Sequence, residues 1–97
     1  MSERPQAVPK RLIENKRVAV TEWRFPPHGE TGWHVHAMDY LVLPQTDGKL
    51  LLETKDGDRY AELRIGHPYF RHAGVEHNVV NANDFELVFI EVEVKSP

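Results

Sequence analysis

Two histidines separated by a single residue, His34 and His36, are the feature of this sequence most able to carry chemistry. In a β-strand, residues i and i+2 point to the same face and lie about 6.5–7 Å apart. Two imidazoles at that spacing can converge on one ion, because a zinc–nitrogen bond is about 2.0–2.1 Å long. The spacing therefore predicts part of a metal site, although two solvent-facing histidines would give the same pattern.

The residues around these histidines have the pattern of an all-β protein. Short apolar runs are separated by glycine, proline, asparagine and aspartate, and Asp56-Gly57 is typical of a hairpin turn. Such spacing favours a sandwich or barrel over alternating strands and helices. We expect an N-terminal arm over residues 1–16, with a short helix at 10–15 as an alternative, and a barrel domain over residues 17–97. Strands are predicted at residues 17–25, 33–43, 50–55, 59–65, 68–71, 77–81 and 85–94.

The segment that holds His34 and His36 resembles the first conserved motif of the cupin superfamily. That motif is a glycine, five residues and His-X-His, followed by a glutamate and a second glycine. A later stretch resembles the second cupin motif, with its conserved positions in register at Gly66, Gly74, His77 and Asn81. The two gapped motifs cover more than half of the chain, so the pair is far more specific than either motif alone.

This resemblance implies the fold and the metal ligands. A cupin is an all-β, single-domain antiparallel jelly-roll barrel, and the motifs place the ligands of one divalent metal ion (Fe, Zn, Ni, Mn or Cu) at His34, His36 and His77. Within the superfamily, residues 21–25, 32–34, 39–44 and 70–79 look like a group of small cupins often labelled β-alanine-degradation proteins. The resemblance therefore implies a role in small-molecule catabolism.

The chain departs from the cupin motifs where a fourth ligand is expected. Many cupins have a glutamate four residues after the second histidine, and here Tyr40 stands at that place. Strand alternation puts Tyr40 on the face of His36 and puts Asp39 on the opposite face, so Asp39 could ligate only if a bulge turned it inward. We expect Tyr40 to face the site, either as a packing residue or as a catalytic group that donates a proton or a hydrogen bond.

Three further residues are candidate substrate contacts. Glu22 and Arg24 share one face of the predicted strand at residues 17–25, and a charge that points into a barrel needs a partner or a ligand. His72 replaces the proline of the second cupin motif and is the third candidate. By contrast, Glu91 and Glu93 are expected on a solvated or interface face.

The sequence leaves two functions open. The first is a metal-binding enzyme, an oxygenase or isomerase, that acts on a small anionic carboxylate or keto compound. Three neutral imidazoles leave coordination positions on the ion open, and they leave its charge uncompensated, which favours an anionic substrate. The alternative is a metal-free cupin that binds or epimerises a small ligand, with a histidine as base and Tyr40 as acid. Elemental analysis of untagged protein distinguishes the two.

Composition limits the partners and the compartment. The net charge of -3 has no basic patch behind it, which argues against nucleic-acid binding. No apolar run approaches the roughly 20 residues of a membrane helix, and the polar first 16 residues do not resemble a signal peptide. The chain has no cysteine, and we expect a cytoplasmic protein. A barrel this short exposes strand edges, which favours a homodimer.

Overall fold

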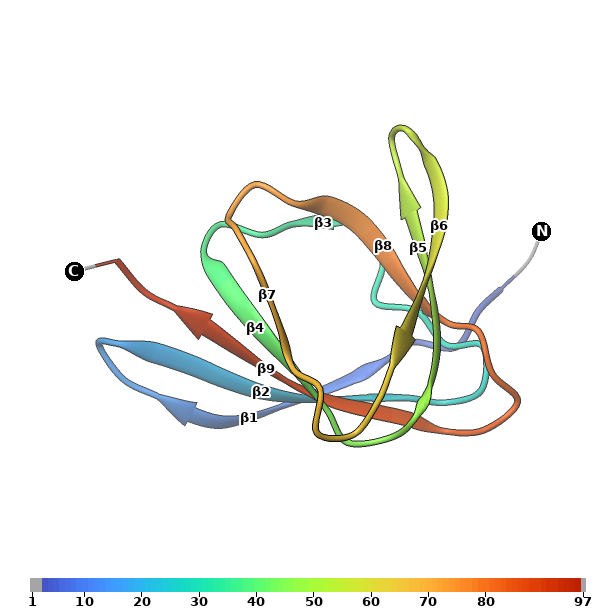
Figure 1. The fold of residues 1–97 in the computed structure, drawn as a ribbon, viewed down its shortest axis with the longest axis horizontal. Coiled ribbons are helices and arrows are strands. Elements are labelled where there is room, and N and C mark those ends of the chain that lie inside the picture. The colour runs from blue at the N-terminus through green and yellow to red at the C-terminus, as the bar shows by residue number, and fades with distance from the viewer. Residues whose placement is uncertain (1–2, 97) are drawn as a thin grey trace.

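Two antiparallel β-sheets face each other in the computed structural model, which describes residues 3–96 (Figure 1). The larger sheet has the order β1-β2-β9-β4-β7, and the smaller has the order β3-β8-β5-β6. No helix occurs among the described residues, and the expected all-β antiparallel barrel is confirmed. The strands are β1 (Val8–Glu14), β2 (Val18–Phe25), β3 (His34–Val35), β4 (Asp39–Pro44), β5 (Gly48–Thr54), β6 (Gly57–Leu63), β7 (Tyr69–Arg71), β8 (Glu76–Asn81) and β9 (Leu87–Val94).

The N-terminal residues differ from the expected loose arm. Residues 8–14 form β1, which pairs antiparallel with β2 and carries an irregularity between Arg11 and Ile13. The helix considered for residues 10–15 is therefore wrong. A strand satisfies the backbone hydrogen bonds that a loose arm would leave to water. Every residue of β1 is exposed, so β1 extends the sheet without adding to the core.

The predicted strand over residues 33–43 is two strands, not one. Between β3 and β4 the chain leaves the smaller sheet and enters the larger. At this crossing the His36 N–H donates to the Val75 carbonyl (2.9 Å), and the Gly74 N–H donates to the His36 carbonyl (2.8 Å). These bonds replace a strand ladder and fix the corner at which the second histidine stands.

An apolar core lies between the sheets, and the buried side-chain amide of Asn81 binds the turns at its edge. Phe25, Leu50, Leu63 and Leu87 are at most 1 % exposed. Asn81, which is fully buried, donates to the carbonyls of three residues in the surrounding turns, Phe25, Pro26 and Phe85. Since an unpaired buried carbonyl is costly, Asn81 stabilises the turns that bound β8.

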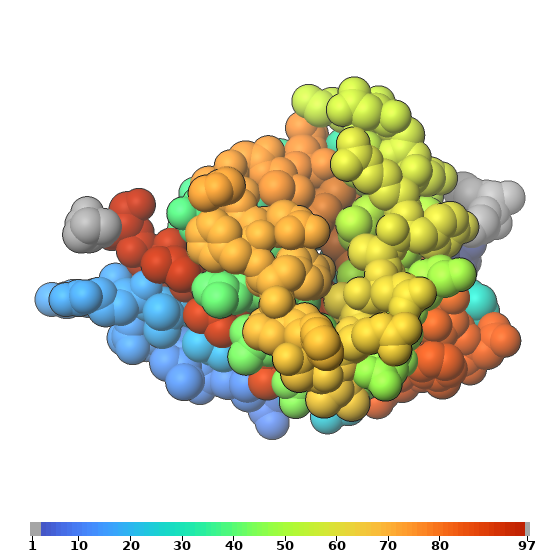
Figure 2. All heavy atoms as spheres, in the orientation of Figure 1, coloured from blue at the N-terminus to red at the C-terminus, as the bar shows by residue number. Residues whose placement is uncertain are grey.

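The β5–β6 hairpin projects beyond the body of the molecule, beside the atoms of β7 and the loop that follows it (Figure 2). Its turn is the predicted Asp56-Gly57 pair, and Gly57 has φ +112°, a value that other residues rarely adopt. No helix long and apolar enough to cross a membrane occurs in residues 3–96.

Candidate metal centre

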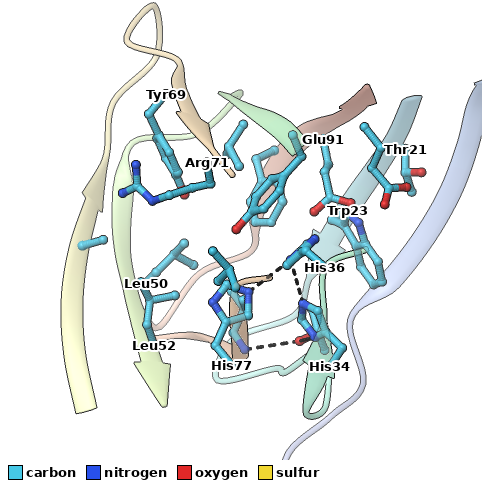
Figure 3. Close-up of a pocket in the computed structure, with 18 of the residues that line it drawn as sticks. Thr21, Trp23, His34, His36, Leu50, Leu52, Tyr69, Arg71, His77 and Glu91 are labelled. Carbon is cyan, nitrogen blue, oxygen red and sulfur yellow. Dashed lines mark hydrogen bonds between the residues drawn. The ribbon is translucent and has the colours of Figure 1, made fainter. Parts of the chain in front are cut away.

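Three histidine side chains converge at one corner of the barrel (Figure 3). His34 on β3 lies opposite His77 on β8, and His36 follows at the crossing between the sheets. The Nε2 atom of His36 lies 3.0 Å from that of His34 and 3.2 Å from that of His77. Three ligands around an ion with bonds of about 2.0–2.1 Å are separated by roughly 3.4 Å. The donor set therefore fits a divalent ion with little rearrangement.

Burial keeps two of these histidines neutral. His36 and His77 are each 7 % exposed. Burial, followed by the neighbouring imidazole of His34, lowers the pKa of each to about 4. Neutral imidazole is the form that binds a metal, so both side chains are ready to ligate at neutral pH.

His34 is held by its other ring nitrogen. The carbonyl of Gly32 lies 2.8 Å from Nδ1 of His34, and a carbonyl can only accept. Nδ1 therefore carries the proton, and the lone pair of Nε2 is directed to the triad. A partner of this kind, behind the ligand, sets the orientation of metal-binding histidines in general.

Tyr40 lies directly against the triad, as expected from its spacing. Its ring stacks on that of His36 with centroids 3.9 Å apart and an angle of 17°, and it is 3 % exposed. Burial raises the pKa of Tyr40 well above its usual value. Asp39 points elsewhere and accepts a hydrogen bond from the N–H of Ala73 at 2.7 Å. The interruption between β3 and β4 thus does not turn Asp39 toward the histidines.

The three candidate substrate contacts lie outside the cavity, and this expectation needs correction. Glu22 and Arg24 are on the outer face of β2, where Arg24 pairs with Glu22 and with Glu86. The neighbouring positions of β2, Thr21 and Trp23, line the cavity instead. The side chain of His72 is 85 % exposed and does not line the cavity. Both faces of β2 contain large apolar residues, Val18 and Val20 on one and Trp23 and Phe25 on the other, so strand alternation alone does not indicate which face points inward.

A cavity of about 690 Å³ opens beside the triad and is lined by both sheets. Sequence patterns did not place three of the charged residues that line it, Arg71, Glu91 and Glu93, at the site. Arg71 on β7 is next to Tyr40 in the sheet, with its guanidinium 4.4 Å from the ring centre of Tyr69. Glu91 and Glu93 on β9 also line the cavity, contrary to the expected solvated or interface face.

The two glutamates approach the triad only from the side of His36. Ligand atoms of His36, Glu91 and Glu93 lie within 4.8 Å of one another, and this group shares only His36 with the three-histidine group. Burial, and secondly the charge of Glu93, raises the pKa of Glu91 to about 7. Alternation in β9 could have located both glutamates, but the other phase of the strand is entirely apolar, with Val88, Ile90, Val92 and Val94, and this favoured an outward direction for the glutamates.

Comparison with known proteins gives close relatives. The chain is 61 % identical over 95 residues to the β-alanine degradation protein BauB of Pseudomonas aeruginosa, covering 98 % of this chain and 100 % of the relative. A cupin domain protein of Bordetella pertussis has a crystal structure with 56 % identity and a TM-score of 0.97, over 99 % of this chain and 100 % of the other.

More distant structures share the fold alone. A double-stranded β-helix domain from Klebsiella pneumoniae has 18 % identity and a TM-score of 0.77, over 97 % of this chain and 81 % of its own. No protein-family model matches the chain. The histidine geometry, the barrel and the full-length identity agree, and the chain belongs to the family of small cupins that includes the β-alanine degradation protein BauB.

Proposed function

We propose that this cupin binds one divalent metal ion through His34, His36 and His77 and acts on a small anionic metabolite, a carboxylate or keto compound, as an oxygenase or isomerase. The convergence of three Nε2 atoms beside a cavity supports this proposal. The ion could be Fe, Zn, Ni, Mn or Cu, since imidazole suits several of these metals. When bound, it supplies Lewis acidity or, if it is redox-active, reactivity toward dioxygen.

The charge around the cavity supports an anionic substrate. Three neutral imidazoles do not compensate a divalent ion, so an anionic ligand would restore neutrality. The charged residues that line the same cavity are three arginines, Arg11, Arg59 and Arg71, against the two carboxylates of Glu91 and Glu93, and a guanidinium suits a carboxylate ligand. The name of the Pseudomonas relative refers to β-alanine degradation, and a role in that pathway or in related catabolism agrees with a small carboxylate substrate.

Tyr40 is the proposed catalytic group of this chain's own residues. Its ring is stacked on His36, which places it against the same corner of the cavity as the triad. Its raised pKa keeps the hydroxyl protonated at neutral pH, so Tyr40 can donate a hydrogen bond or a proton to a ligand but cannot act as a base.

Elemental analysis of protein purified without a polyhistidine tag or chelator tests the metal. We expect about one ion per chain, and anomalous scattering at several absorption edges would identify it within the triad. No metal in the purified protein, and none bound after addition of Fe, Mn, Ni, Cu or Zn, would refute the proposal.

A metal-free cupin that binds or epimerises a small ligand is the second candidate. The close stacking of Tyr40 on His36, at the position where many cupins have a carboxylate, favours it. In such a protein His36 or His77 is a neutral base and Tyr40 is the acid. Ligand turnover by protein that contains no metal, unchanged after exhaustive chelation, would support this candidate over the first.

We also propose a homodimer that covers the outer face of the larger sheet. This face presents partly exposed apolar side chains in neighbouring rows of β2, β9 and β4, namely Val18, Val20, Ile90, Val92, Leu41 and Leu43. Contiguous apolar surface of this kind marks interaction sites. Sedimentation should therefore give about twice the chain mass of 11.2 kDa, and a monomer at micromolar concentration would refute the dimer.

The remaining expectations stay predictions. The net charge of -3 supports the absence of a nucleic-acid partner, and a cytoplasmic location without membrane attachment fits a catabolic role. Fractionation of cells that express the protein at native level checks both expectations, because membrane-bound or nucleic-acid-bound protein would separate from the soluble fraction.

A further inference from the structure

The loop that precedes β3 is held on both sides by backbone hydrogen bonds. On one side the Ala7 N–H donates to the Glu30 carbonyl (2.8 Å). On the other side the Thr31 N–H donates to the Val79 carbonyl (3.0 Å). Residues 29–31 therefore lie as a short inserted segment between the N-terminal residues and β8. The next residue, Gly32, provides the carbonyl that accepts from His34.

A buried side-chain amide, that of Asn78, holds the backbone of Gly32 through the N–H of that residue. Asn78 is 7 % exposed, and its Oδ1 accepts a hydrogen bond from the Gly32 N–H at 2.9 Å. Gly32 has φ +92°, which is open to glycine and strained for other residues. The Asn78 contact therefore holds Gly32 in an unusual conformation, from which its carbonyl reaches Nδ1 of His34.

We propose that Asn78 is a positioning residue for the metal centre, acting through Gly32 to hold His34 in the tautomer that presents an unprotonated Nε2. This inference rests on the proposed metal-binding function. If the carbonyl of Gly32 turned away, His34 could carry its proton on Nε2 instead, and that nitrogen would no longer ligate. Partners behind a ligating histidine generally change metal affinity by about 10- to 100-fold.

The hydrogen-bond network continues from Asn78 to the N-terminal residues. The amide nitrogen of Asn78 donates to Glu30 (2.9 Å) and to Glu53 (2.8 Å). Arg4 pairs with the same two carboxylates at 3.1 Å each. Arg4 thus offsets two like charges that meet at one amide, and it secures Asn78 in the orientation that accepts from Gly32. A residue near the start of the chain is in this way connected to the orientation of a metal ligand.

Substitution of Asn78 tests the inference in two independent measurements. The first is ¹⁵N NMR of histidine-labelled, metal-free protein, which reports which ring nitrogen of His34 carries the proton. The second is titration with Co²⁺, followed by its visible absorption, which reports affinity and coordination geometry. For Asn78→Ala we expect a mixture of His34 tautomers and a Kd for Co²⁺ about 10- to 100-fold weaker than that of the unaltered protein.

Two matched variants separate this role from general destabilisation. Asn83→Ala removes a hydrogen-bonded amide that contacts Lys49 and Asn81, away from the triad, and should leave both measurements unchanged. If Asn78→Ala does not fold, Arg4→Met provides the test, because it removes the ion pairs with the two carboxylates, Glu30 and Glu53, that bind the amide of Asn78. We expect it to weaken Co²⁺ binding, though less than Asn78→Ala does, whereas Arg24→Met, which breaks ion pairs on the outer face, should not.

The outcomes are distinguishable from failure of the proposed function. A folded Asn78→Ala protein with His34 still protonated only on Nδ1, and with unchanged Co²⁺ affinity, would overturn the inference. So would equal Co²⁺ affinity in Arg4→Met and Arg24→Met. If the unaltered protein binds no metal, the proposed function fails, and the tautomer of His34 in the metal-free protein still decides whether Asn78 positions it.

Discussion

The cavity has two contrasting walls, an imidazole corner and an acidic strand. In the corner, His34 is bonded through Nδ1 to a backbone carbonyl, and the backbone of His36 is bonded to Gly74 and Val75. On the opposite sheet, Glu91 and Glu93 stand side by side on one face of β9, partly buried. Burial acts on both walls by disfavouring charge, but with opposite results for the chemistry.

In the corner, burial favours function, because the neutral histidine is the ligand. On the acidic wall, burial opposes the ionised carboxylate, and the adjacent like charge adds to the cost. The corner is therefore organised before any ligand arrives. On the acidic wall, the burial of Glu91 and its repulsion by Glu93 are unfavourable, and a bound cation, a proton or a ligand would reduce this cost. The following changes test this difference, from the largest expected effect to the smallest.

Removing one ligand of the corner should have the largest effect. In His77→Ala, two imidazoles remain, and we expect metal affinity to fall by more than about 100-fold, with the β fold retained in circular dichroism. His72→Ala is the matched control, because the side chain of His72 is 85 % exposed and should not affect metal content. Full metal occupancy in His77→Ala would show that the centre lies elsewhere.

Acid should destabilise the metal-free protein through the same corner. The pKa of His36 and of His77 is lowered from 6.5 to about 4 in the folded state, so the unfolded chain binds more protons between these values. Stability is therefore complete above about pH 6.5 and falls by a few kcal/mol as the pH drops to about 4. Urea unfolding at pH 7, 5.5 and 4.5 measures this loss. Constant stability over that range would contradict it.

Glu91→Gln should stabilise the protein at alkaline pH. The folded-state pKa of Glu91 is raised from 4.5 to about 7, so the folded protein binds more protons than the unfolded chain between these values. The free energy of unfolding therefore falls as the pH rises through this interval. Glutamine cannot ionise, and we expect a gain of roughly 1–3 kcal/mol at pH 8 and almost none at pH 4.5. Thermal unfolding at both values checks this. Glu22→Gln, on the outer face of β2, should show no comparable difference between the two pH values.

Tyr40→Phe should leave the metal in place and alter only the reaction or ligand binding. The ring can still stack on His36, so the corner keeps its packing, while a donor to the ligand is lost. We expect one metal ion per chain and, with a substrate in hand, about a 10- to 100-fold lower turnover. Unchanged turnover would assign Tyr40 to packing alone.

Much of this organisation could be predicted from local patterns. The spacing of His34 and His36, the turn at Asp56-Gly57 and most strand positions are local properties, since they depend on alternation and on residues that favour turns. The position of His77 followed from the cupin motifs, and the cross-strand pair of His34 and His77 agrees with it. Tyr40 was expected at the site and is found there.

The face of each strand could not be decided in the same way. β2 and β9 have apolar residues in both phases, so alternation predicted an inward Glu22 and Arg24 and an outward Glu91, and both predictions were wrong. The inward phase of β9 holds Leu87 and Phe89 in the core and then Glu91 and Glu93 at the cavity, so one face of one strand is apolar at one end and acidic at the other. Periodicity within the strand does not show where the core ends and the cavity begins.

The sequence by itself therefore determined the type of fold, the identity of the three histidines and the residue stacked against them. Only the tertiary structure decided that residues 8–14 are a strand, that the chain changes sheets between His34 and Tyr40, and that Arg71, Glu91 and Glu93 line the cavity. The physical reason is that a side chain's direction in a strand is set by register against distant strands. Those partner strands are far away in sequence, so the short-range periodicity of one strand carries no information about its register against them.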